Sequence, residues 1–428
     1  MQNRKIKLSQ CMIVKNEEDN IEKALSWGKQ IMWEQIVVDT GSTDRTVELA
    51  ESLGVKVYHF PWIDDFSAAK NFAIEQASGD WIAFLDADEY IKEEDVGKIL
   101  PMLQLAETSG YDAVRTDLLS IDRAEKIQNF IKQTRFFKRL PDLRYEGIIH
   151  ECLFFGNGES INSRLMEDQG SVTIYHTGYA PEEMEKKKKK ERNHKLLSSY
   201  LQLHPDDYYA MGDMGDHYLT QDGKIDEAES WYRKAVERIP KIPAAQCDRN
   251  VKSFLMLMRI LLKKGNGDEL QKLYHEMMTG FRDVYDADYM MAKYYVETRG
   301  DYQKGADYLE RALGILEKQG TGQYGPMLLR ELPEAWELLA ECYYKNGHLS
   351  KCVSCCVALL KADKKRVSAL TILLHALAGE NVQAVLRFLM KLYDLQDPND
   401  KNVLMQACQE VGAEELIRKV ENIDGEIS

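Results

Sequence analysis

The chain has 428 residues, 44% of them hydrophobic, and its 70 acidic and 56 basic residues give a net charge of −14. This length allows two or three domains with sizeable cores, and the acidic balance argues against a dedicated nucleic-acid binder, which would show a basic footprint. We find no apolar run of membrane-spanning length and no secretory signal before Arg4, so we expect a cytoplasmic protein without a membrane span.

Apolar runs that end in polar residues follow one another through the first part of the chain. Residues 7–14 predict a first strand, with a polar segment at its tip. Residues 34–39 predict a second strand that ends in an acid and leads through a glycine turn into a helix, and residues 55–60 predict a third strand. This alternation is typical of the nucleotide-binding half of a doubly wound sheet.

Two carboxylates one residue apart close the fourth predicted strand. The uncharged run 81–85 predicts a buried strand, which ends in Asp86 and Asp88. Ligands of open α/β sheets bind at the carboxyl ends of strands, and hard divalent cations prefer oxygen ligands and bridge to phosphates. The pair therefore indicates either a cation site or a solvated acidic turn, since Asp-x-Asp also occurs by chance.

Four motifs in this order resemble the inverting family 2 glycosyltransferases, which have the GT-A fold. The motifs lie at residues 11–18, 37–44, 66–71 and 84–89, and the resemblance extends over about residues 5 to 180. Four linked motifs are much more specific than any one of them. The resemblance implies transfer of a sugar from a nucleotide-diphosphosugar, with uridine as the expected nucleoside.

The resemblance also implies a donor site at the strand tips. Asp39 would accept a hydrogen bond from the base or ribose, and Arg135 would either hold the diphosphate or pair with an acid. Lys70 stands where the family usually has arginine, so the charge is kept and the planar fork is lost; its alternative is a lysine on a helix surface. The implied donor-binding residues are Val14, Asn16, Glu17, Asp39, Lys70, Asp86, Ala87 and Arg135.

A divalent cation, Mn²⁺ or Mg²⁺, is implied beside these residues. Asp88 would coordinate it directly, and Asp86 would hold the ribose or a water on the metal. His176 would complete the coordination, or else would be a buried histidine that is hydrogen-bonded to the backbone. As a Lewis acid the cation would neutralise the charge that develops on the departing diphosphate.

Strand-like segments at residues 133–139, 145–151 and 173–179 are expected to build the acceptor side. They are similar to elements of a bacterial branch of the family that carries C-terminal helical repeats and includes enzymes that glucosylate cysteine in antimicrobial peptides. Inversion in a single displacement needs a base beside the acceptor. Glu151 is the first candidate, and His150 would orient the substrate or the metal; a salt-bridged pair that closes a strand is the competing interpretation.

The composition changes near residue 181. Lysines 186–190 follow glutamates at 182, 183 and 185. Acids placed four residues ahead of lysines predict a solvated linker helix in preference to a site that binds a diphosphate or an anionic membrane. Beyond residue 206, segments 215–240, 292–312 and 336–356 follow the small-residue and aromatic spacing of tetratricopeptide units. We interpret Cys352 and Cys355, although spaced as Cys-x-x-Cys, as core residues of a repeat helix.

The predicted fold class is thus α/β followed by all-α. We expect a GT-A domain over residues 1–180, a helical linker over 181–205 and a tetratricopeptide-like α-solenoid over 206–428. The concave face of such a solenoid is a common place to bind a peptide, and helical repeats can also supply homodimer contacts.

The predicted function is metal-dependent transfer of a hexose or N-acetylhexosamine to a cysteine, serine or threonine of a peptide or protein. The alternative acceptor is a cell-envelope glycan or a lipid-linked sugar, with the repeats used for assembly. A third interpretation is a scaffold with an inactive transferase domain, against which the intact acids at 39, 86 and 88 argue.

Overall fold

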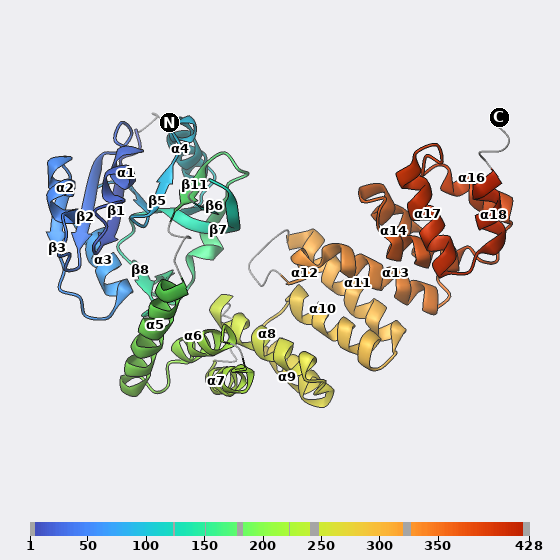
Figure 1. Cartoon of the computed structure of the whole chain (residues 1–428). Coiled ribbons are helices and arrows are strands. Elements are labelled where there is room, and N and C mark those ends of the chain that lie inside the picture. Colours follow the sequence, from blue (N-terminus) through green and yellow to red (C-terminus); the bar gives the residue numbers. More distant parts are fainter. Residues whose placement is uncertain are drawn as a thin grey trace. The chain divides into compact units, whose positions relative to one another are not determined.

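A computed structural model describes residues 5–122, 125–149, 151–177, 183–221, 223–239, 248–319 and 327–422. These residues form two compact units (Figure 1), one built from the residues up to 239 together with 248–250, and the other from the residues from 251 on. The first unit contains the mixed sheet and the helices α1 to α7, and the second unit contains helices only.

Four parallel strands form one half of the main sheet, in the order β3-β2-β1-β4, and they confirm the four strands expected from the apolar runs. Val14 at the end of β1 pairs with Asp39 at the end of β2, and β1 also pairs with β4 up to Phe84. The loop that carries Asp86 and Asp88 therefore leaves the sheet beside the tip of β1. The strands are β1 (Leu8–Val14), β2 (Glu34–Asp39), β3 (Lys56–His59) and β4 (Trp81–Phe84).

The other half of the sheet is mixed and continues from β4 in the order β7-β6-β11-β5. β7 is antiparallel to both β4 and β6, and β11 is antiparallel to β5. A separate hairpin is formed by β8 (Leu143–Glu146) and β9 (Cys152–Phe155). The remaining elements are β5 (Glu89–Ile91), β6 (Ala113–Ile121), β7 (Ile127–Lys138), the 3₁₀ turn η1 (Ile161–Arg164), β10 (Leu165–Glu167), which pairs with β6, and β11 (Thr173–His176).

Helices cover both faces of the sheet, which explains why β4 has no polar residue. Trp81 and Ala83 join the apolar cluster under α4, whereas Ile82 and Phe84 join the cluster under α3 on the opposite face. Alternate side chains of a strand point to opposite faces, so a strand covered on both sides is apolar throughout. The helices are α1 (Ile21–Ser26), α2 (Thr46–Ser52), α3 (Phe66–Gln76) and α4 (Glu93–Thr108).

Three helices that follow the sheet belong to the same compact unit. Leu196 and Leu197 of α5 and Ala210 and Met211 of α6 share an apolar cluster with Ile149, which lies just beyond β8. The predicted domain boundaries stay a prediction, but this packing places α5 to α7 with the sheet. The helices are α5 (Glu183–Leu203), α6 (Tyr208–Leu219) and α7 (Ile225–Arg238); the side chains of lysines 186–189 lie outside the described residues.

The second unit continues as pairs of helices. Its core includes Cys352 and Cys356 of α14, free cysteines that are fully buried. The elements are α8 (Asp248–Lys263), α9 (Gly267–Gly280), α10 (Tyr285–Lys293), the π-helix η2 (Tyr294–Thr298), α11 (Tyr302–Gln319), α12 (Met327–Arg330), α13 (Leu332–Lys345), α14 (Leu349–Ala362), α15 (Val367–Ala376), α16 (Val382–Leu389), α17 (Pro398–Glu410) and α18 (Glu414–Asn422).

A small residue allows α6 and α7 to approach closely. A Cβ atom added at Gly215 would lie 2.6 Å from Cε1 of Tyr232, whose ring is fully buried. We expect Gly215→Ala to lower the free energy of unfolding by about 1–3 kcal/mol, because the added methyl group would overpack the core between α6 and α7. Urea unfolding followed by circular dichroism measures this change.

The matched control is Gly97→Ala, in the exposed face of α4, where an added Cβ would meet no atom within 4 Å. Because alanine is the better helix former, this variant should gain up to about 1 kcal/mol. Equal stability of wild type and Gly215→Ala would contradict the close packing of α6 on α7.

Candidate active site

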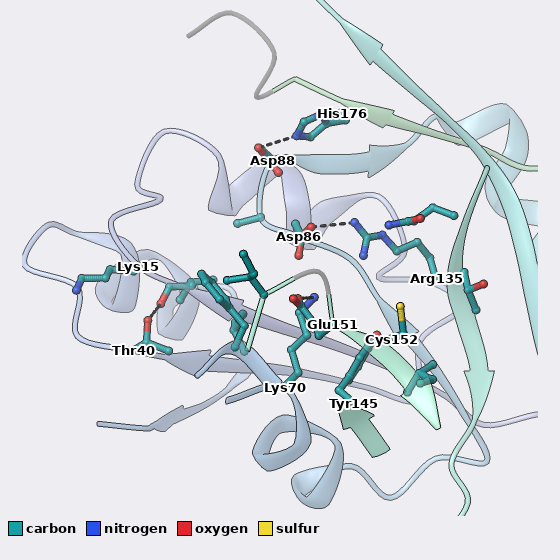
Figure 2. Close-up of a pocket in the computed structure, with 18 of the residues that line it drawn as sticks. Lys15, Thr40, Lys70, Asp86, Asp88, Arg135, Tyr145, Glu151, Cys152 and His176 are labelled. Carbon is teal, nitrogen blue, oxygen red and sulfur yellow. Dashed lines mark hydrogen bonds and ion pairs between the residues drawn. The ribbon is translucent and has the colours of Figure 1, made fainter. Parts of the chain in front are cut away.

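A cleft of about 720 Å³ lies at the carboxyl ends of β1 and β4 (Figure 2). Its wall also takes residues from the start of α3, from the middle of β7, from the loop between β8 and β9, and from α5. The structure brings nine of the predicted site residues to this cleft: Val14, Glu17, Lys70, Asp86, Ala87, Asp88, Arg135, Glu151 and His176.

Two predicted donor residues do not line the cleft, and His150 lies outside the described residues. The Asp39 carboxylate accepts hydrogen bonds from the backbone N–H groups of Ser42, at 3.0 Å, and Gly41, at 3.2 Å. Asn16 Oδ1 likewise accepts from the Thr43 N–H at 2.8 Å. These side chains hold the turn after β2, and their contact with a nucleoside stays a prediction.

A buried guanidinium neutralises the acids at the end of β4. Arg135 of β7 donates from Nη2 to Asp86 Oδ2, at 2.8 Å, and to Glu89 Oε1, at 2.5 Å. Burial alone would raise the pKa of Asp86, but the charges of Arg135 and Lys70 lower it below its ordinary value. Glu89 is only 2% exposed, and burial raises its pKa in spite of Arg135. Sequence reasoning gave Glu89 no role.

Asp88 and His176 face each other across the pairing of β5 with β11. The His176 Nε2 atom lies 3.0 Å from Asp88 Oδ2, and Thr177 N donates to the Asp88 carbonyl at 2.9 Å. Burial would lower the pKa of His176, but the Asp88 carboxylate raises it above the ordinary value. The structure thus brings these two predicted metal ligands together, and their binding of a cation stays a prediction.

The chemistry of this pair fits a divalent cation that is also bound by its substrate. Within the described ranges, no group of three or more His, Cys, Asp or Glu side chains is placed to hold a metal ion. Asp88 and His176 offer one carboxylate and one imidazole, so a cation here would take its other ligands from phosphate oxygens and water, as Mg²⁺ commonly does.

Lys70 and Glu151 form an ion pair in the cleft (Figure 2), with side chains that are 7% and 13% exposed. Lys70 is therefore not a helix-surface lysine. Its Nζ atom lies 5.3 Å from the ring centre of Phe84 and 5.1 Å from that of Tyr145. Glu151 pairs with a residue 81 positions earlier in the chain, which sequence reasoning did not foresee.

The start of α3 is fastened to the neighbouring hairpin. Ser67 Oγ donates to the Gly147 carbonyl at 2.6 Å, while Asn71 Nδ2 donates to the Tyr145 carbonyl at 2.9 Å and Asn71 Oδ1 accepts from the Tyr145 N–H at 2.8 Å. Since Lys70 lies between these two anchors, the helix fixes the position of its backbone beside the segment that carries Glu151. The Tyr145 hydroxyl is buried and has no hydrogen-bond partner among the described residues.

Comparisons with known proteins agree with this architecture. The glycosyl transferase family 2 model matches residues 9–156, and the tetratricopeptide repeat model matches residues 209–242. The N-terminal part of the chain is a family 2 glycosyltransferase domain. The expected GT-A-like mixed sheet followed by a helical region with a tetratricopeptide repeat is thereby confirmed.

Two relatives are similar to this chain over a little less than two thirds of its length. A TPR repeat-containing protein of Synechococcus elongatus is 30% identical over 267 residues, 61% of this chain and 62% of that protein. The SPbeta prophage-derived glycosyltransferase SunS of Bacillus subtilis is 28% identical over 284 residues, 65% of this chain and 64% of that protein. The chain thus spans less than two thirds of the length of these relatives.

Among solved structures, S. aureus TarS in complex with UDP-GlcNAc is similar over 69% of this chain and 93% of the other, with 15% identity and a TM-score of 0.38.

Among the helices that the structure describes, none is both long enough and apolar enough to cross a membrane.

The buried charges make Arg135 necessary for the stability of the glycosyltransferase domain. We expect Arg135→Met to lower the free energy of unfolding by about 3–5 kcal/mol, because Glu89 is left as a buried charge without its partner. A second substitution, Glu89→Met, should restore part of this loss. Urea unfolding of the single and double variants measures both effects.

Arg45→Met is the control, since Arg45 and Glu48 form an exposed ion pair with side chains that are 63% and 69% exposed. It should leave the stability nearly unchanged. An Arg135→Met variant as stable as wild type would show that Glu89 does not depend on the guanidinium.

Proposed function

We propose that this protein is an inverting glycosyltransferase that moves a hexose or N-acetylhexosamine from a uridine diphosphosugar to a cysteine, serine or threonine of a peptide or protein. The observation that carries the proposal is the convergence of Asp86, Asp88, Lys70 and Glu151 on one cleft of a family 2 glycosyltransferase domain. Acids and cations at the carboxyl ends of the strands suit a diphosphate, a cation and a base.

In the proposed reaction Glu151 removes the proton from the acceptor hydroxyl or thiol. The acceptor oxygen or sulfur forms a bond to the anomeric carbon from the face opposite the diphosphate, and the bond between that carbon and the diphosphate oxygen breaks. Its electron pair leaves with the diphosphate, so the configuration inverts in a single step. A positioned base of this kind contributes about 10²–10⁴ in rate.

A bound Mn²⁺ or Mg²⁺ would stabilise the charge on the leaving diphosphate. Asp88 and His176 are the residues that we propose to hold it. Asp86, which is hydrogen-bonded to Arg135, lines the same cleft and is proposed to contact the ribose or a metal-bound water.

The chain's resemblance to the branch with helical repeats supports a peptide or protein acceptor. The repeats could supply the binding surface, because stacked helix pairs form extended concave faces. The alternative is a cell-envelope glycan or lipid-linked sugar, with the repeats used for assembly or for a homodimer.

Metal dependence can be tested at Asp88. We expect EDTA to abolish transfer and Mn²⁺ to restore it in the wild type, and we expect Asp88→Asn to lower the rate by about 10² or more because the leaving charge loses its stabilisation. Release of UDP from the donor measures the rate, and thermal unfolding checks the fold.

Asp19→Asn is the control, because Asp19 is an exposed acid in the loop after β1 that does not line the cleft. Full metal-stimulated turnover in Asp88→Asn would remove the cation from this position.

A panel of nucleotide-sugars with Mn²⁺ tests the enzyme class and the donor. We expect slow hydrolysis of one uridine diphosphosugar without acceptor, and faster consumption when peptides with Cys, Ser or Thr are added, with the sugar located by mass spectrometry. Faster consumption only with glycans or lipid-linked sugars would favour the alternative acceptor. No consumption of any donor would support an inactive scaffold.

A further inference from the structure

The ion pair between Lys70 and Glu151 joins two residues with separate tasks in the proposed reaction. Glu151 is the proposed base, and Lys70 is the proposed contact to the donor diphosphate. In the structure, the Lys70 ammonium forms an ion pair with Oε1 of Glu151, so each residue is occupied by the other. The ammonium group lies against one oxygen of the carboxylate and obstructs the approach of an acceptor hydroxyl or thiol to that oxygen.

Burial makes this pairing difficult to replace by water. Both side chains are nearly buried, and the other neighbours of the Lys70 ammonium include the faces of two aromatic rings. An isolated charge in such a place is unfavourable, so Lys70 can leave Glu151 only for another anion. The ion pair with Glu151 is the one that Lys70 makes with the residues that the structure describes.

An incoming diphosphate is such an anion and is proposed to bind in the same cleft. The Lys70 ammonium lies 5.3 Å from the ring centre of Phe84, the last residue of β4, so it is close to the strand end from which the predicted donor residues follow. Figure 2 shows Lys70 and Glu151 between Asp86 and Tyr145. Because α3 is anchored on both sides of Lys70, the exchange requires only rotation of its long, flexible side chain.

We propose that the donor diphosphate takes Lys70 away from Glu151, and that the base is therefore released only after the donor has bound. This inference rests on the proposed function. The donor then has to bind before the base can act, and Lys70 is a positioning residue for Glu151 as well as a partner of the leaving group. Before donor binding, Glu151 and the anionic donor compete for one ammonium group.

The competition has a measurable consequence for donor binding, which does not depend on turnover. We expect Glu151→Gln to bind UDP about tenfold more tightly than the wild type, since Lys70 no longer has to leave a carboxylate. Lys70→Met should bind UDP about tenfold more weakly. In the Lys70→Met background, Glu151→Gln should bring no further gain, because the two residues act through one interaction.

Isothermal titration with UDP, in the presence and absence of Mg²⁺, measures these affinities on the full chain. Glu167→Gln is the matched control: it removes the same charge from an acid that pairs with another cleft lysine, Lys132, at 3.4 Å. We expect this control to change UDP affinity by less than about twofold, as is usual for a partly exposed pair. Lys70→Arg should retain UDP binding.

The outcomes separate this inference from the proposed function. If the wild type binds UDP but Glu151→Gln binds it equally or less tightly, or if Glu167→Gln tightens binding as much, the exchange is wrong and the proposed function stands. If the wild type binds neither UDP nor another nucleoside diphosphate, the proposed function itself fails. Thermal unfolding confirms that each variant is folded, and Glu151→Ala provides a second test should Glu151→Gln not fold.

Discussion

The candidate site depends on one electrostatic constraint: carboxylates placed at the end of a buried strand need a positive charge beside them. Asp86 and Glu89 follow β4, which is covered on both faces, and Arg135 reaches both of them from the neighbouring strand β7. Without that guanidinium Glu89, which is 2% exposed, would be an unpaired charge out of water, at a cost of several kcal/mol. With it, Asp86 can remain ionised at the edge of the cleft.

The mixed half of the sheet gives this loop its remaining supports. β11 runs antiparallel to β5 and places His176 opposite Glu89. The imidazole therefore lies within hydrogen-bond distance of Asp88, the residue directly before β5. The parallel half of the sheet positions the loop that carries Asp86 and Asp88, and the later strands supply Arg135 and His176, which contact these acids. The candidate site is therefore built from residues that are distant in sequence and that the pairing of strands brings together.

Much of this arrangement could be predicted from the sequence, and the reasons are local. Largely apolar segments identified β1, β2 and β4, and the polar or acidic residues that end them identified the tips. What could not be predicted are pairings that cross the fold: Lys70 with Glu151 and Arg135 with Glu89. Charge and spacing do not reveal which of many acids a lysine will meet once helix and hairpin have packed.

The prediction for Asp39 shows the same limit of sequence patterns, which do not reveal the hydrogen-bond partners of a side chain. A polar residue at a strand tip is expected in the ligand site, but the short turn after β2 also needs acceptors for its backbone N–H groups, and the carboxylate lies where it satisfies two of them. Position at a strand end limits the roles of a residue to a few, and the hydrogen bonds in the structure show one that the sequence did not predict. Contact of Asp39 with a nucleoside stays a prediction.

The apolar cluster around Ile149 bears on how the catalytic part of the chain can be isolated. Ile149 lies two positions before Glu151 and packs with Leu196 and Leu197 of α5 and Met211 of α6. A truncation after the last strand would expose this cluster to water and loosen the segment that carries the proposed base. A minimal catalytic fragment should therefore extend through α7, although family resemblance alone would end it some sixty residues earlier.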